Sequence, residues 1–255
     1  MRIILVLIVL VTLSGCAPVF LKKPLSDQEV EKVLSLLKAQ EEAADTFFNT
    51  GQMVVKDWYW DQEANTLIAG TRTPLRLRIE VTHAWGQPIL HLVVVGKSFK
   101  ALSYGERKLY MGDLAPGALS KFFPADLDAD LIWDVVRGFP KLRSGGRRES
   151  RTADRLSVLD RNGDESEILD LDPESGLPRQ TLFPQRKVGV RYLDFQQEGG
   201  ILYAGEVRVR QLEGTRSLTL KNGKMVFNKP IPDEIFRMEI PPGFETERIE
   251  KEKTD

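Results

Sequence analysis

Alternating apolar and polar residues predict a chain that is built mainly of β-strands. The clearest alternation lies in residues 75–82, where Leu75, Leu77, Ile79 and Val81 occupy one face and polar side chains occupy the other. Comparable runs predict further strands at 51–60, 65–72, 88–95, 98–104 and 106–111, and then at 155–160, 166–171, 178–183, 187–196, 201–211 and 215–228.

A helical period replaces this alternation in three places. From Ser26 to about Ala44, apolar residues recur at i, i+3, i+4 and i+7, and Ser26 with Glu29 has the spacing of a capping box. Residues 116–123 and 127–137 predict two short helices between the halves of the chain. Many strands in hairpin order with grouped helices indicate an α+β fold around a strongly curved antiparallel sheet.

The N-terminal segment has the organisation of a secretory signal. Arg2 precedes an apolar run at 3–13, which is shorter than the roughly 20 residues of a membrane-spanning helix. Leu13-Ser14-Gly15-Cys16 resembles the bacterial lipobox, which implies cleavage before Cys16 and lipidation of its thiol. An ordinary signal peptide with an incidental cysteine is the alternative. Ala17 is not Asp, and under the enterobacterial sorting rule this indicates the outer membrane, with the protein facing the periplasm.

These features divide the chain into four parts. We expect a lipoprotein signal peptide at 1–15, a lipidated tether at 16–25, one folded domain at 26–245 and a charged, disordered tail at 246–255.

Composition narrows the classes of function. Charged residues make up 29% of the chain, which excludes a multi-span membrane protein. Lys and Arg total 36 against 37 Asp and Glu, a balance that argues against nucleic-acid binding. Cys16 is the only cysteine and there are two histidines, so we expect neither a metal site nor a cofactor.

Candidate catalytic and ion-binding groups are few. His91 lies in an apolar strand and is expected to be a wall residue, whereas His83 lacks a visible catalytic partner. Asp160, Asn162 and Asp164 have the spacing of calcium ligands, but Asn162-Gly163 also favours a simple hairpin turn. Because no known catalytic motif is present, we expect a protein that is not an enzyme. Arginines also cluster in a segment predicted to be a solvated loop, with a contact to lipid phosphate as the alternative (Arg143, Arg147, Arg148 and Arg151).

Several short segments resemble the outer-membrane lipoprotein-sorting carriers LolA and, especially, LolB. They share the family's turns and strand starts, although Ala84-Trp85 replaces Pro-Leu in one turn. The segments are Leu75–Val81 with Ala84–Pro88, Leu131–Pro140, Gly176–Pro178, Asn228–Phe236 and Pro241–Phe244.

The resemblance implies an incomplete, half-open β-barrel with a helical lid over an apolar cavity and an N-terminal amphipathic helix. It implies a carrier that binds acyl chains of lipids or lipoproteins in this cavity and helps to transfer or insert them into the membrane, with a soluble periplasmic lipoprotein carrier as a candidate partner. It also implies that Trp85 is a membrane-insertion residue. The alternation aims four strand residues at the cavity and the lid adds a tryptophan (Leu77, Ile79, Leu92, Val94 and Trp133).

Two alternatives remain open at the level of sequence. The same apolar residues could fill a solid core, because composition does not separate a lined cavity from a filled one. In that case the protein would be a structural or adaptor lipoprotein that holds a partner in the cell envelope. Trp85 could likewise fold back onto the sheet instead of projecting from its turn.

Overall fold

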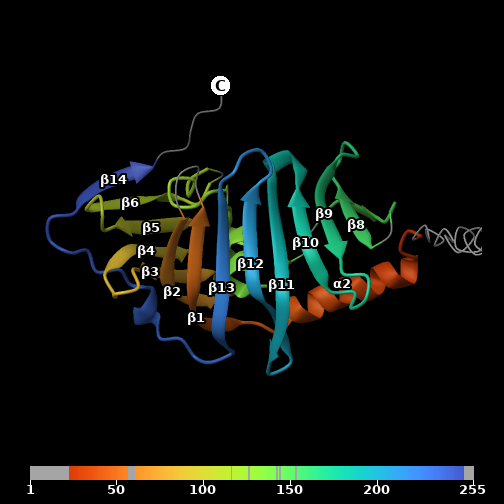
Figure 1. Cartoon of the computed structure of the whole chain (residues 1–255), viewed down its shortest axis with the longest axis horizontal. Helices are drawn as coiled ribbons and strands as arrows, with labels where there is room; N and C mark the ends of the chain where they lie inside the picture. The colour runs from red at the N-terminus through yellow and green to blue at the C-terminus, as the bar shows by residue number, and fades with distance from the viewer. Residues whose placement is uncertain are drawn as a thin grey trace, which may run out of the picture.

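A computed structural model describes residues 23–56, 61–115, 117–125, 127–141, 143, 145–152 and 154–249. In this part of the chain, fourteen strands form one sheet and two α-helices accompany it (Figure 1). The strands are β1 (Thr46–Lys56), β2 (Asp61–Thr71), β3 (Arg76–Thr82), β4 (Pro88–Val95), β5 (Ser98–Ser103), β6 (Lys108–Asp113), β7 (Arg147–Glu149), β8 (Arg155–Leu159), β9 (Glu165–Leu171), β10 (Pro178–Phe183), β11 (Val188–Glu198), β12 (Ile201–Gln211), β13 (Ser217–Phe227) and β14 (Glu245–Ile249).

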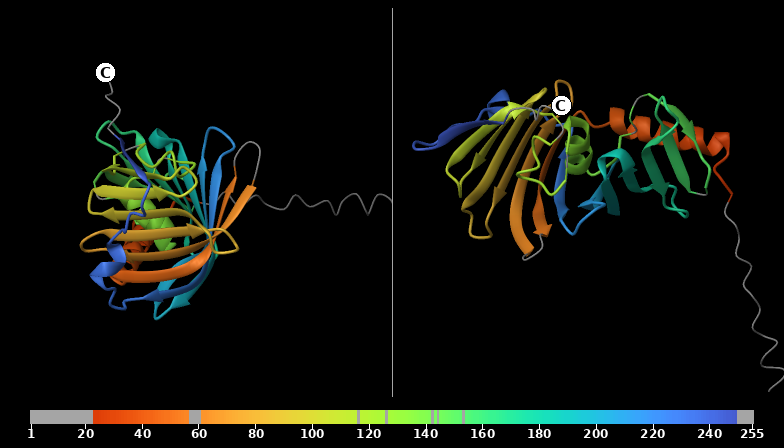
Figure 2. Two further views of the ribbon diagram at one scale, coloured as in Figure 1. Left: turned by 90° about the vertical axis from the view of Figure 1, so that its left-hand side faces the viewer. Right: turned by 90° about the horizontal axis from the view of Figure 1, so that it is seen from above.

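The order of the strands is β14-β6-β5-β4-β3-β2-β1-β13-β12-β11-β10-β9-β8-β7. Neighbours are antiparallel throughout, except that β14 runs parallel to β6. The sheet curves strongly, and its terminal strands β14 and β7 do not pair with each other, so it stays unclosed (Figure 2). The predicted curved antiparallel sheet is therefore confirmed, with one parallel pair that the sequence analysis did not predict.

The first helix, α2 (Asp27–Glu42), begins at the predicted capping box. The Ser26 hydroxyl accepts the Glu29 backbone N–H, and the Glu29 carboxylate accepts the Ser26 N–H at 2.8 Å. Val33 and Leu37 on its apolar face are buried against the second half of the sheet, in a cluster that includes Phe139. This helix holds β8 and β9 to the rest of the domain.

The second helix, α3 (Ala129–Arg137), lies within the curve of the sheet (Figure 2). The predicted helix at 116–123 is wrong over its described residues, because 117–123 form successive turns. Their backbone bonds span mainly three residues, as between the Phe122 N–H and the Leu119 carbonyl, and Gly117 has a φ of 79° that interrupts a helix.

A C-terminal strap, residues 229–244, crosses the outer face of β3, β4 and β5 before the chain enters β14 (Figure 2). Arg76 pairs with Asp233 of the strap at 2.6 Å, and Arg78 donates to the Ile235 carbonyl at 2.7 Å. Strap and sheet are thus joined by arginines from the polar side of β3.

The prediction of a disordered tail is wrong at its beginning. Residues 245–249 form β14, and Glu247 pairs with Lys108 of β6 at 2.7 Å. Backbone pairing and charge hold this strand, and it buries little apolar surface. Its sequence is therefore polar, and for that reason composition alone predicted disorder. Asn222-Gly223 lies inside continuous β13, opposite an irregularity of register between Asn49 and Gly51.

Candidate functional site

The concave face of the sheet and the α3 helix that covers it make the candidate site. Asp128 caps the helix, since its carboxylate accepts the Leu131 N–H at 2.8 Å, and Gly138 ends it with a left-handed φ of 76°. Seven consecutive residues of α3 are buried, because the helix is surrounded by the sheet on more than one side (Leu131, Ile132, Trp133, Asp134, Val135, Val136 and Arg137).

Gly138 is needed where α3 meets the sheet. Its carbonyl accepts the Ala204 N–H at 2.7 Å, and a Cβ on residue 138 would lie 3.1 Å from both the Ala204 nitrogen and the Asn222 amide nitrogen. Asn222 in turn donates to the Ala204 carbonyl at 2.7 Å and accepts from Asn49 at 2.6 Å. A buried amide pair therefore fixes the end of α3 against β12 and β13.

The five residues predicted to line a cavity do face the concave side together. Leu77 lies opposite Val94, Ile79 lies opposite Leu92, and Trp133 comes from α3 to meet the Phe47 ring. The four strand residues are 0–1% exposed and Trp133 is 6% exposed, within one continuous cluster. The four strand side chains are too inaccessible to border a water-sized void, so in this conformation they form a filled core in place of the expected open cavity.

Trp85 lies at the tip of the β3–β4 turn and is 71% exposed. Its ring stacks on His83, with centroids 4.4 Å apart and planes 3° apart. Gly86 takes a φ of 88°, which tightens the turn. Trp85 therefore projects from the sheet, and the alternative in which it folds back onto the sheet does not describe it.

Cys16, like the rest of residues 1–22, lies outside the described residues. Among the described helices, none is long and apolar enough to cross a membrane.

A buried polar cluster beneath α3 was not found from the sequence. Asp134 is 2% exposed and Glu167 of β9 is 1% exposed. Burial raises the pKa of Asp134 well above its usual range, although Arg143 opposes this shift. Burial likewise raises the pKa of Glu167 to about 7. The Glu167 carboxylate accepts the Arg143 backbone N–H at 3.2 Å, and this hydrogen bond opposes the rise in pKa. The one available signal was an acid, Asp134, inside the apolar Trp-Asp-Val-Val run.

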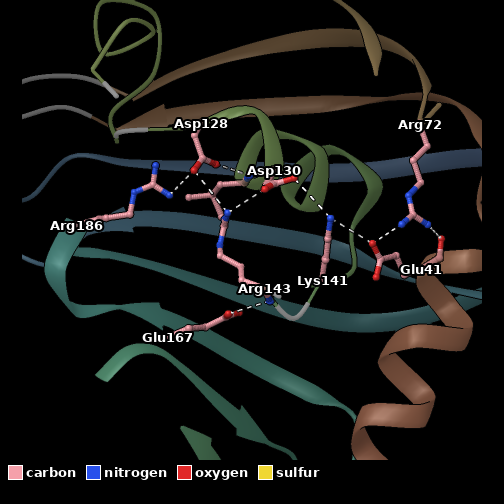
Figure 3. Close-up of polar contacts among 9 residues, drawn as sticks. Glu41, Arg72, Asp128, Asp130, Lys141, Arg143, Glu167 and Arg186 are labelled. Atoms are coloured by element: carbon pink, nitrogen blue, oxygen red, sulfur yellow. Dashed lines mark hydrogen bonds and ion pairs between the residues drawn. The ribbon is translucent and has the colours of Figure 1, made fainter. Parts of the chain in front are cut away.

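Arg143 belongs to this cluster and not to a solvated loop. Its guanidinium reaches Asp130 at 3.4 Å and Asp128 at 3.5 Å, at the start of α3 (Figure 3). Arg147 and Arg151 pair with Glu149. The expectation of a solvated arginine is therefore wrong for Arg143, whereas Arg147 and Arg151 stay solvated, with side chains 72% and 65% exposed.

Ion pairs continue around the rim of α3 (Figure 3). Asp128 pairs with Arg186 at 2.9 Å, and Lys141 reaches both Asp130 at 3.7 Å and Glu41 of α2 at 3.3 Å. Glu41 also pairs with Arg72, in the turn after β2. Apart from the buried Asp134 and Arg137, the helix is thus apolar where it faces the sheet, and it is linked by charge to α2 and to both halves of the chain.

The remaining sequence candidates have structural partners. His91 is buried on the outer face of β4, and burial, assisted by Arg78, lowers its pKa to about 4. His91 is therefore neutral at pH 7, as expected for a structural residue in a strand. The Asp160 carboxylate accepts the backbone N–H groups of Asn162 at 2.9 Å and Asp164 at 3.1 Å, so these residues form a turn.

This open, curved sheet with a helix on its concave face is similar to the fold of LolA-like proteins. A DUF1329 family protein from Desulfovibrio piger has a TM-score of 0.57 and 10% identity, with 82% of this chain and 97% of that chain covered. A putative outer membrane lipoprotein-sorting protein domain from Vibrio parahaemolyticus has a TM-score of 0.54 and 9% identity, with 80% and 94% covered. A LolA superfamily protein from Nitrosomonas europaea has a TM-score of 0.53 and 14% identity, with 82% and 97% covered.

At these identities the similarity establishes the fold alone. No protein-family model matches the sequence, and no curated protein matches it either.

Proposed function

We propose that this protein is a periplasmic lipid or lipoprotein carrier, anchored to the outer membrane through acylated Cys16. It binds acyl chains against the concave face of the sheet, beneath α3, and delivers them to the membrane with the help of Trp85. A soluble periplasmic carrier is the proposed donor. The proposal includes no covalent chemistry on the cargo, and the LolA-like fold supports it.

The observation that carries the proposal is the contrast between the two sides of α3. Toward the sheet, the helix buries Leu131, Ile132 and Trp133; along its rim, it is linked by exchangeable ion pairs such as Asp130–Lys141. Each large apolar side chain contributes roughly 1.5–3 kcal/mol when it is buried. Acyl chains that take the place of α3 supply apolar contacts of the same kind, so the helix can be displaced without exposing the sheet to water.

Photocrosslinking tests this proposal. Trp133→benzoylphenylalanine places a probe of similar size under the lid, and the matched control replaces Tyr104, which packs on Phe244. Lipid crosslinked in cells to position 133 and absent at position 104, identified by mass spectrometry, is the expected result. Equal labelling at both positions, or none at 133 in a folded protein, would contradict the proposal.

The filled core favours a second candidate. A structural or adaptor lipoprotein needs no ligand between α3 and the sheet, and the 0–1% exposure of Leu77, Ile79 and Leu92 fits that function. Native mass spectrometry of the Cys16→Ala protein, purified from cells, separates the two candidates. A carrier retains acyl lipid, and an adaptor is lipid-free.

A further inference from the structure

A cavity of about 1120 Å³ lies at the open end of β4, β5 and β6, on the side of the sheet that faces away from α3. Small-molecule sites are typically clefts of roughly 300–1,000 Å³, so this cavity has room for a lipid-sized ligand. It continues around the strand ends to the small residues Gly117 and Ala118. None of the five concave-face residues described above lines it.

The floor of the cavity is apolar. Val93 of β4 and Met111 of β6 project from the outer face, and Phe236 and Met238 of the C-terminal strap form a facing wall. Phe236 is held in place by the Arg76 guanidinium, 4.6 Å from its ring centroid. Strap and sheet therefore present one continuous apolar surface.

Three cations surround this floor. Lys100 and Arg248 lie in register with Met111 from its two neighbouring strands, so each is about 5 Å from it along the sheet. Arg237 approaches from the strap, and all three line the cavity and are exposed.

Cations outnumber carboxylates in the described lining of this rim, although Arg237 also interacts with Asp233 of the strap. Among the described residues, none of the three cations makes an ion pair, although Lys108, also on β6, pairs with Glu247 at 2.7 Å. Asp113 is the one carboxylate among the described residues of the lining. The chain as a whole has a formal charge of −1, so this surplus of positive charge is a local property.

We propose that this cavity binds a phospholipid with an anionic head group. The phosphate lies among Lys100, Arg237 and Arg248, and an acyl chain covers Val93, Met111 and the strap. The cations and the apolar floor are one strand apart, which suits a ligand whose charge and chain are covalently joined. The proposed positions of the phosphate and the acyl chain lie on the outer face, so the proposal does not depend on acyl binding beneath α3.

Titration calorimetry with short-chain lipids tests the proposal. Dihexanoyl phosphatidylglycerol and dihexanoyl phosphatidylcholine have the same chains and differ in net charge. We expect the first to bind about tenfold more tightly at low salt, and the difference to shrink at high salt as the cations are screened. Equal affinity for the two lipids would overturn the proposal.

Charge reversal locates the site. Lys100→Glu and Arg248→Glu should each abolish most of the preference for the anionic lipid. The control is Arg191→Glu, which changes an exposed side chain on β11 and should leave the preference unchanged. All three side chains are exposed, so the variants should fold. An unchanged preference in both cavity variants would place the lipid elsewhere and overturn the proposal.

Two further measurements exclude other occupants. Inorganic phosphate that binds as tightly as phosphatidylglycerol would indicate a free-phosphate site. A chain that ends at Ile249 tests the segment of mixed charge at 250–255 as an alternative occupant. Lipid binding that occurs only in this shortened chain would make residues 250–255 the occupant. Either result overturns the proposal, and similar lipid binding with and without the segment supports it.

Discussion

The Trp133 ring on α3 meets the Phe47 ring on β1 edge to face, with 5.3 Å between the ring centroids. Phe47 also presses on Gly70 of β2, where an added Cβ would lie 2.5 Å from the Phe47 ring. The contact therefore connects the lid helix, β1 and β2 through two aromatic rings and a glycine. Removing the Trp133 side chain should therefore loosen α3.

Trp133→Ala is expected to lower the free energy of unfolding by about 3–5 kcal/mol, the range for truncating a buried large aromatic. Urea denaturation followed by circular dichroism measures the loss. Trp85→Ala is the matched control, because Trp85 is 71% exposed and its truncation should change stability little. A loss below about 1 kcal/mol at position 133 would contradict the filled core.

Glu167 makes stability depend on pH. Its pKa is raised in the folded state to about 7 by burial. A carboxyl with a raised folded pKa contributes stability that is fully present below its unfolded pKa and is lost as pH rises through the folded pKa. The contribution should therefore disappear between about pH 4.5 and pH 7, and amounts to about 3 kcal/mol.

Glu167→Gln removes this titration. We expect the stability difference between wild type and variant to change in that window, in favour of the variant as pH rises. His91, whose lowered pKa acts in the opposite direction, is present in both proteins and cancels, so the difference reports Glu167 together with its electrostatic effect on Asp134. Glu174→Gln, in an exposed turn, should follow wild type at every pH, and the same behaviour in Glu167→Gln would refute the prediction.

Gly138 and Gly163 allow backbone strain to be separated from close packing. Both have positive φ, at 76° and 89°, but a Cβ at 163 would meet open space, whereas one at 138 would meet Ala204 and Asn222. Gly163→Ala should cost about 1 kcal/mol from conformation alone, and Gly138→Ala should cost more. Equal losses in thermal unfolding would show that the contact with Ala204 relaxes freely.

Trp85→Glu tests delivery to the membrane. An exposed tryptophan at a turn suits a bilayer interface, where its ring is buried and its N–H remains hydrated. The variant should keep near-normal stability and lipid binding but transfer less lipid to liposomes. Ile240→Glu changes another exposed apolar residue, on the strap, and should transfer normally. Normal transfer by Trp85→Glu removes this residue from the function.

Cys16→Ala tests the anchor. Because Cys16 is the only cysteine and ends the lipobox-like segment, the variant should lose incorporation of radiolabelled palmitate and accumulate as a precursor or an unanchored protein. Ser14→Ala keeps a small residue in the motif and should be labelled. Palmitate that persists in Cys16→Ala would show that the lipid is attached elsewhere.

The sequence predicted strands well wherever one face is buried. The run 75–82 contains β3, whose burial alternates along the strand because every second side chain faces the core. The runs 88–95, 178–183 and 201–211 coincide with β4, β10 and β12. Buried residues that do not belong to an alternating pattern were harder to identify from the sequence. Asp134 was not identified because its environment comes from β9 and the loop at Arg143, both distant in sequence. Whether the concave face is filled also depends on how α3 docks, which local patterns do not contain.

The two outer strands of the sheet have a consequence for how copies of this protein meet. A long, apolar edge would offer its free backbone groups to another chain and so template aggregation. Here one edge is β14, five residues with charges at Glu245, Glu247 and Arg248, and the other is β7, three residues that read Arg-Arg-Glu. Because the strap brings β14 to cover β6, both margins of the fourteen-stranded sheet are short and charged. The unclosed sheet is therefore protected against growing by addition of a neighbour's strand.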